Sequence, residues 1–286
     1  MSYFDYIIAT KLFGQGSGEQ KEEVELNVTE NGTYNAPDGQ TYNPVNVNVS
    51  ATVEKPYMTY TVNAQNLITG VKLYSDNEVP QYVCNGFQWL ENVDLSGCAN
   101  ATNIPYGAFQ GCVALSTILS FPNHVTNISS YAFKNCYRLT LTELPSSLTT
   151  IDSNAFESCQ SLVLTELPSN LTTIGGAAFS HCTGLTSIKF PSRLLSIGNL
   201  AFHNCTGLTS IKFPSRLLSI GNAAFMNCTG LTSVTFSARP TELLYPATFS
   251  SCSNLLDIYV PWAEGEVDYA PWGATNATIH YNWTEA

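Results

Sequence analysis

The sequence predicts a β-rich repeat solenoid of about eight coils, each of roughly 23–25 residues, with a small β-module before the stack and an aromatic cap after it. Two regularities predict this fold. The motif Phe-x-x-Cys recurs seven times at almost constant spacing, with its cysteines at Cys112, Cys136, Cys159, Cys182, Cys205, Cys228 and Cys252. An apolar residue follows each cysteine by three positions, and residues 206–228 repeat residues 183–205 almost letter for letter. Because one such unit cannot bury its apolar residues alone, neighbouring units must stack.

The first expected element is an amphipathic helix over residues 2–13, within an N-terminal segment of residues 1–18. Ser2 and Asp5 form a capping box, and the glycine-rich stretch 14–18 ends the helix as a flexible linker. A helix this short is marginal alone in water, so we expect it to dock on a partner or on copies of itself. Its apolar face, the candidate docking surface, consists of Phe4, Ile7, Ile8 and Leu12.

Residues 19–66 are expected to form the β-module. Polar and apolar residues alternate over residues 24–28 and again over residues 45–49, as strands with one buried face require. Turn-forming pairs lie between them at Asn31-Gly32 and around Asp38-Gly39.

Residues 67–260 are expected to form the solenoid, and the unit 183–205 shows how one coil is built. Residues 185–190 alternate as a short strand that ends at Pro191, since proline cannot continue a strand ladder. A second short extended segment follows at residues 194–197. Residues 201–205 are expected to form a single helical turn whose Phe202 and Cys205 point into the core. An earlier, degenerate unit is expected at Cys84–Leu95, with Cys84 in the phenylalanine position and Phe87 in the cysteine position.

Residues 261–286 are expected to cap the last coil. This segment concentrates large aromatic residues near the end of the repeats, where an exposed core edge would need a cover. The residues concerned are Trp262, Trp272, Tyr281 and Trp283.

Composition excludes several classes of partner. The chain of 286 residues is only 12% charged and carries a net charge of −11, with eleven Lys and Arg residues in total. Nucleic-acid binding needs clustered cations, so no nucleic-acid partner is expected. No apolar run reaches about 18 residues, so membrane insertion is not expected either.

Motifs of catalytic chemistry are scarce. The nine cysteines form no Cys-x-x-Cys pair, and the four histidines have no ligand spacing, so neither a metal nor a cofactor is expected. Seven cysteines occupy one inward column, where we expect buried free thiols. No nucleophile elbow occurs, and the recurring carboxylates Glu143 and Glu166 fit solvated strand positions better than an acid–base pair. The sequence therefore predicts a protein that is not an enzyme.

The remaining candidate site is the outward strand surface. One outward position of each coil defines what we call the outer row: Asp94, Leu119, Glu143, Glu166, Lys189, Lys212, Thr235 and Tyr259. A second outward row is expected at Asn92, Thr117, Leu141, Leu164, Ser187, Ser210, Ser233 and Asp257. Rigid sheets of this kind are the usual binding surfaces of solenoids. Within the outer row the candidate binding residues are Asp94, Glu143, Glu166, Lys189, Lys212 and Tyr259. The alternative is a merely solvated face with cross-strand pairs such as Glu166–Lys189.

The repeat pattern L-x-x-I-x-F-P-S-x-L-x-x-I-G-x-x-A-F-x-x-C-x-x-L resembles the BspA-like leucine-rich repeat family over roughly residues 80–260. The pattern departs from the family at Thr142 and Thr165, which replace the usual isoleucine beside Leu141 and Leu164. The resemblance implies a bacterial surface or virion-associated binding protein without enzymatic activity.

Residues 30–50 resemble a short β-module found near the start of phage tail and prophage-encoded proteins. Residues 1–12 lack an early Lys or Arg and a small-residue cleavage site, so a secretion signal is not expected there. We therefore expect an adhesion or protein-interaction module on a phage virion, binding a protein or a surface glycan of the host or of the virion. Two alternatives stay open: an architectural spacer or decoration subunit, and an adhesin of the bacterial cell surface. A homo-oligomer through the N-terminal helix is a further expectation.

Overall fold

The computed structural model describes residues 27–28, 34–35, 41–42, 58–63, 67–73, 79, 81–241, 245–266 and 268–284. The candidate docking residues Phe4, Ile7, Ile8 and Leu12 lie outside these residues, as does the stretch 45–49. A small antiparallel sheet in the order β1-β2-β3 is described within the range expected for the β-module. Its strands are β1 (Asn27–Val28), β2 (Tyr34–Asn35) and β3 (Thr41–Tyr42).

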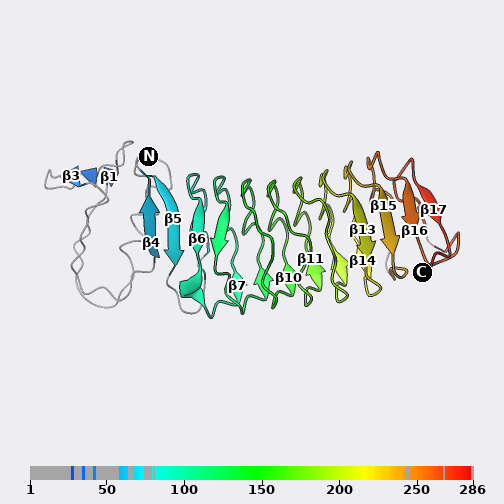
Figure 1. Cartoon of the computed structure of the whole chain (residues 1–286), viewed down its shortest axis with the longest axis horizontal. Coiled ribbons are helices and arrows are strands. Elements are labelled where there is room, and N and C mark those ends of the chain that lie inside the picture. The colour runs from blue at the N-terminus through cyan, green and yellow to red at the C-terminus, as the bar shows by residue number, and fades with distance from the viewer. Residues whose placement is uncertain are drawn as a thin grey trace.

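The rest of the described chain winds into a β-solenoid of about nine turns (Figure 1). Two faces of the stack carry short strands, paired parallel from coil to coil. One face holds the sheet β14-β12-β11-β10-β9-β7. Its strands are β7 (Asn103–Ile104), β9 (Asn127–Ile128), β10 (Thr150–Ile151), β11 (Thr173–Ile174), β12 (Ser196–Ile197) and β14 (Ser219–Ile220).

The other face carries the expected first strand of each coil, in two separate sheets. One is ordered β4-β5-β6-β8 and the other β13-β15-β16-β17. Their strands are β4 (Met58–Val62), β5 (Ile68–Leu73), β6 (Asn92–Asp94), β8 (Thr117–Leu119), β13 (Ser210–Phe213), β15 (Ser233–Phe236), β16 (Asp257–Tyr259) and β17 (Thr278–His280). Strand β4 falls in the range expected for the β-module, but it pairs antiparallel with β5 and forms the edge of the solenoid sheet.

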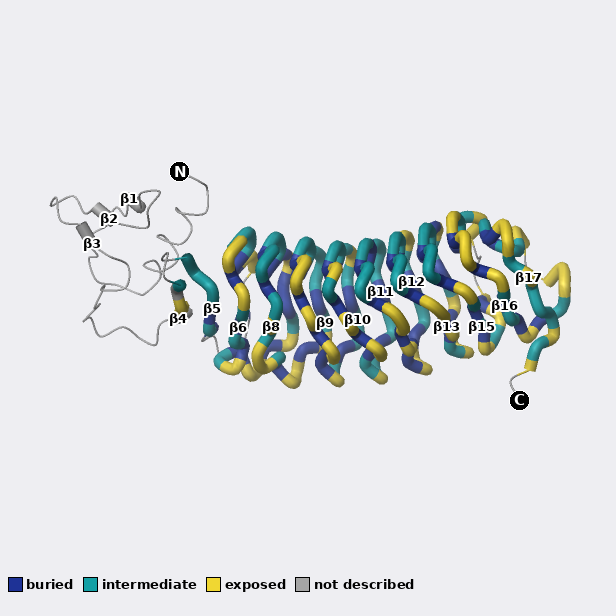
Figure 2. The backbone as a smooth tube through the Cα atoms, turned by 45° about the horizontal axis from the view of Figure 1, so that its top comes forward, coloured by how far each residue is buried: buried dark blue, intermediate teal, exposed yellow. Residues whose placement is uncertain are grey.

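Register follows the sequence repeat. Thr150 pairs with Thr173 and Ile151 with Ile174, one repeat apart. Identical positions therefore lie side by side along the stack, with the isoleucines buried and the hydroxyl residues half-exposed (Figure 2). This alternation is what a strand with one buried face requires.

The phenylalanines of the Phe-x-x-Cys motif form a continuous column in the core, as the sequence predicts. From Phe109 to Phe225 the rings are fully buried, and successive centroids lie 5.1–5.4 Å apart with near-parallel planes. The coil spacing sets this distance, because neighbouring strands lie about 4.8 Å apart. Equivalent side chains of consecutive coils are thus held in contact.

The predicted helical turn at residues 201–205 is wrong. Cys205 N–H donates to the Phe202 carbonyl at 3.2 Å, three residues back, and Leu200 and Asn204 have left-handed φ angles of 58° and 59°. Left-handed residues interrupt a right-handed helix, so the segment is a series of tight turns. The turns free backbone groups to bond between coils, as in the 2.7 Å bond from Phe202 N–H to the Ala224 carbonyl.

All nine cysteines are buried and none is in a disulfide, as predicted. Each thiol of the column donates to the carbonyl of the residue in the phenylalanine position one coil earlier, for example Cys205 Sγ to Phe179 O at 3.0 Å. Cys112 donates in the same way to the carbonyl of Cys84, which confirms the expected exchange of positions in the degenerate unit. Burial raises the pKa of Cys205 to about 12, so this thiol stays protonated.

The C-terminal segment is a further coil rather than only a cap. Strand β17 pairs parallel with β16 and extends the stack by one layer. The aromatic side chains lie along the stack: Trp272 and Trp262 are buried against Phe236, with ring centroids 5.8 Å and 5.3 Å away. The strands therefore continue to pair in the C-terminal segment, where the sequence predicted only a cap of aromatic side chains.

A candidate interaction surface on the strand face

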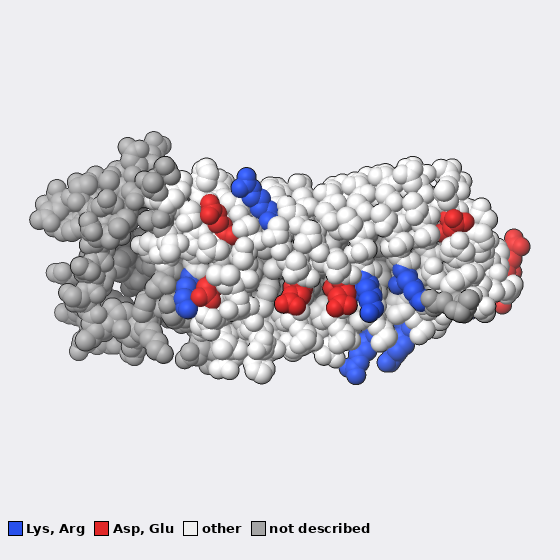
Figure 3. Space-filling model, in the orientation of Figure 1, with Lys and Arg blue, Asp and Glu red and all other residues white. Residues whose placement is uncertain are grey.

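The outer row lies along the face that carries β6, β8, β13 and β16. Figure 3 shows acidic and basic side chains following one another along this face, which is otherwise uncharged over long stretches. The structure brings the row together in three groups, formed by the sheet β4-β5-β6-β8, by an isolated bridge, and by the sheet β13-β15-β16-β17.

The first group is an ion pair at the start of the stack. Lys72 in β5 pairs with Asp94 in β6, with Nζ and Oδ2 3.0 Å apart, and Asp94 pairs in register with Leu119. Partial burial acts to raise the pKa of Asp94, but hydrogen bonds from Ser96 and Lys72 outweigh it, so the pKa of this carboxyl lies below its usual value. Leu119 is 46% exposed and presents an apolar side chain beside the pair.

The middle group lies where strand pairing is weakest. Glu143 is exposed in a segment without a strand, and Glu166 is joined to Lys189 by an isolated parallel bridge. The side chains of Glu166 and Lys189 approach to 4.0 Å and are 70% and 80% exposed. Such an exposed pair contributes little to stability.

The expected second outward row is wrong at two positions. Leu141 and Leu164 are buried, and the neighbouring Thr142 and Thr165 are exposed instead. In these two coils the inward position lies two residues after the core leucine, whereas Ile188 lies three residues after Leu185. An apolar side chain gains free energy only when it faces the core, so the chain shifts locally to bury leucine and expose threonine. This shift breaks the strand alternation.

The third group ends the row in an aromatic cluster. Lys212 is exposed in β13, and its register partner Thr235 in β15 pairs in turn with Tyr259. Tyr259 stacks on His280 with ring centroids 4.6 Å apart, and Trp283 lies 5.4 Å from Tyr259. His280 Nε2 also lies 2.7 Å from Asp257 Oδ1.

Two residues of this surface, Lys72 and His280, were not predicted from the sequence, and Trp283 was predicted only as part of the aromatic cap. A signal existed for Lys72, because it precedes Asp94 by about one repeat and alternates with buried Val71 and Leu73. Lys72 lies before the first Phe-x-x-Cys motif, so the alignment that defines the outer row must be continued one repeat towards the N-terminus to include it. His280 pairs in register with Tyr259, but the spacing between them is shorter than the usual repeat. An alignment with a constant repeat length therefore misses His280.

Other kinds of site find no support in the described part of the chain. There, no three His, Cys, Asp or Glu side chains gather as they would around a metal ion. Within the same residues, no helix is long and apolar enough to cross a membrane.

The fold and this surface define the class: a leucine-rich β-solenoid with charged and aromatic residues on one strand face. Residues 77–194 and 177–268 match the BspA type Leucine rich repeat region in six copies. This chain belongs to that family. The match covers more than half of the chain and coincides with the stacked coils.

Two solved structures are similar to this chain. A leucine rich cell surface protein from Faecalibacterium prausnitzii A2-165 is 22% identical, with a TM-score of 0.53, over 73% of this chain and 70% of the other. A leucine rich repeat protein from T. pallidum is 25% identical, with a TM-score of 0.51, over 63% of this chain and 90% of the other. A search among curated proteins gave no match.

Proposed function

We propose that this protein is a non-enzymatic interaction module of a bacterial cell surface that binds another protein through the outer row. One observation carries the proposal: the row is bipolar. Glu143 and Glu166 precede Lys189 and Lys212 on consecutive coils, on a stack held by backbone pairing and a continuous core. A partner with the opposite order of charges would meet complementary groups at fixed spacing.

The energetics of the row favour its use in recognition. The exposed Glu166–Lys189 pair at 4.0 Å contributes little to folding, so exchanging it for contacts with a partner costs little. The core beneath is already ordered, and a rigid surface loses little conformational freedom on binding. Leu119 and Tyr259 add apolar area near the two ends of the row.

The cell-surface location draws support from the description of the Faecalibacterium relative as a cell surface protein. The virion location expected from the sequence depends on residues 1–18 and 30–50, of which the structure describes only the short strands β2 and β3 and not the expected docking helix. We therefore place the cell surface first and keep the virion as the alternative location. An architectural spacer is the alternative role.

An array of host extracellular-matrix and cell-surface proteins tests the proposal. The wild-type chain should bind at least one protein, and the variant E143K/E166K should lose at least about tenfold in affinity, since charges in a contact set orientation and binding. The matched control is Glu264→Lys, which reverses one exposed carboxylate away from the outer row. An array with no hit would favour the spacer role, and equal binding by the double variant would show that the contact lies outside the outer row.

A further inference from the structure

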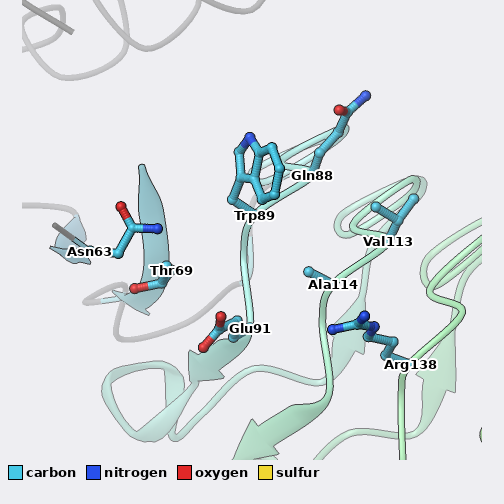
Figure 4. A pocket seen from close by; sticks show the side chains of 8 residues that line it. All are labelled: Asn63, Thr69, Gln88, Trp89, Glu91, Val113, Ala114 and Arg138. Atoms are coloured by element: carbon cyan, nitrogen blue, oxygen red, sulfur yellow. The ribbon is translucent and has the colours of Figure 1, made fainter. Parts of the chain in front are cut away.

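A groove at the N-terminal end of the stack is separate from the outer row. Its volume is about 260 Å³, and it is lined by side chains of several successive layers, among them Thr69, Trp89, Glu91, Ala114 and Arg138 (Figure 4). The groove was not predicted from the sequence, although its residues follow the repeat.

Three of these residues occupy one position of the repeat. Trp89, Ala114 and Arg138 each directly precede a buried core leucine, so they lie side by side on three consecutive coils. With about 4.8 Å between coils, the backbones that carry the indole and the guanidinium are about 10 Å apart. The small Ala114 between them forms the floor of a slot.

The coils that carry Gly184, Gly207 and Gly230 at this position cannot form such a slot. The same position holds Gly184 and Gly207, where an added Cβ would lie 2.5 Å from the carbonyl oxygens of Gln160 and Thr183. Backbone crowding therefore excludes side chains from this position in three successive coils, while Asn254 occupies it again in a later one.

Three side chains that line the groove, those of Trp89, Glu91 and Arg138, are not used by the described part of the fold. Trp89 is 57% exposed and has no ring contact with any described residue. Neither the Glu91 carboxylate nor the Arg138 guanidinium has a hydrogen bond or ion pair within the described residues, and both side chains are exposed. An indole face, a carboxylate and a guanidinium thus face the same space without partners.

We propose that this groove binds a neutral pyranose unit of a glycan. The indole offers a flat apolar face, on which the C–H face of a sugar ring can stack. Glu91 can only accept hydrogen bonds and Arg138 can only donate them, whereas a sugar hydroxyl does both. Glu91 repels an anionic ligand and Arg138 repels a cationic one, so the pair disfavours ligands with a single charge, whereas a neutral polyol can form hydrogen bonds with both groups.

The test is titration of the full chain with methyl glucoside, methyl galactoside, methyl mannoside and their disaccharides. Binding is measured by tryptophan fluorescence and by saturation-transfer NMR, because Trp89 is the most exposed indole that the structure describes. At least one of these probes should bind. Trp89→Ala and Arg138→Ala should each weaken binding at least about tenfold, whereas Trp89→Phe should retain most of it.

The matched control is Arg216→Ala, which removes an exposed arginine of a later coil and should leave sugar binding unchanged. Absence of binding by every probe, preference for glucuronate over the neutral sugars, or full binding by Trp89→Ala would overturn the proposal. The proposal does not depend on the outer row: E143K/E166K should bind the sugar like the wild type, so the two can fail separately.

Discussion

The first coils, residues 68–119, and the twin coils, residues 183–228, solve the same packing problem with different sequences. In the twin coils almost every residue recurs one repeat later, and the Phe202 and Phe225 rings stack 5.1 Å apart with nearly parallel planes. In the first coils Cys84 replaces the phenylalanine, yet the Cys112 thiol still donates to its carbonyl. The core positions therefore remain buried and keep the same hydrogen-bond pattern in both regions.

The two regions differ on the surface. The twin coils carry glycine before the core leucine because carbonyl oxygens crowd that position, whereas the first coils carry Trp89 and Ala114 there. The twin coils also place Lys189 and Lys212 on the outer row. The comparison teaches that repetition secures the core, while departures from repetition create the groove and the charge pattern.

The largest effect is expected from truncating the core of a twin coil. Phe202→Ala should lower the free energy of unfolding by about 3–5 kcal/mol, because it opens a cavity in a continuous ring column. Cys84→Ala, at the same position of the first coils, should cost less because fewer atoms are lost. Urea unfolding measures both. Equal effects would break the comparison, since they would mean that the ring column adds nothing to the twin coils.

The next effect concerns the crowded glycine position. Gly207→Ala should destabilise the protein by about 1–3 kcal/mol, because the new Cβ would overlap the carbonyl of Thr183. Ser161→Ala, at the same position of an earlier coil that already carries a Cβ, serves as the control and should stay within about 0.5 kcal/mol. A neutral Gly207→Ala, measured by urea unfolding, would show that the backbone there can relax and that crowding does not exclude side chains from this position.

The thiols give a pH-dependent effect in both regions. Burial raises the pKa of Cys112 and Cys205 to about 12, whereas an unfolded thiol titrates near pH 8.5. Between these values the unfolded state binds fewer protons, so the free energy of unfolding should fall as the pH rises above about 8.5. Folded protein at neutral pH should resist a thiol reagent, and denatured, unreduced protein should react with close to nine equivalents, one for each cysteine. A count near one would reveal disulfides.

The smallest effect belongs to the ion pair of the first coils. Asp94→Asn should cost less than about 1 kcal/mol at neutral pH, because the pair with Lys72 is partly exposed. The pKa of Asp94 is lowered in the folded state, so its stabilisation is present above the unfolded value near 4 and is lost as the pH falls further. The difference in melting temperature between the variant and the wild type should therefore disappear at acidic pH. A difference that persists there would point to lost packing instead.

Much of the fold was predictable, because the same residue types recur at equivalent positions of each repeat and indicate which positions are buried. The columns of Phe179 and Cys182 and the stacking of the coils follow from the constant period of the repeat, and the free thiols follow from the inward position of the cysteines. The inward turn of Leu141 and Leu164 did not follow, since the choice between two neighbouring positions depends on local packing. The turns around Leu200 differ from the predicted helical turn because bonding between coils, which favours left-handed residues there, is not visible in a local pattern.

The sites were less predictable than the fold. The outer row follows from aligning strand positions, but Trp89 and Arg138 lie outside the strands and are missed by that alignment. Aligning the residue before each core leucine places these two side chains on either side of Ala114. The docking role expected for Phe4, Ile7, Ile8 and Leu12 stays a prediction, because these residues lie outside the described part of the chain.

The central claim, that the outer row contacts a partner, is tested most directly by covalent footprinting of the complex with the protein found on the array. Lysines are acetylated and carboxylates are amidated in the free and bound chain, and mass spectrometry compares the extent of labelling residue by residue. Binding should protect Glu143, Glu166, Lys189 and Lys212 and leave the exposed Glu264 unchanged. Unchanged labelling of these four residues in a saturated complex would contradict the account.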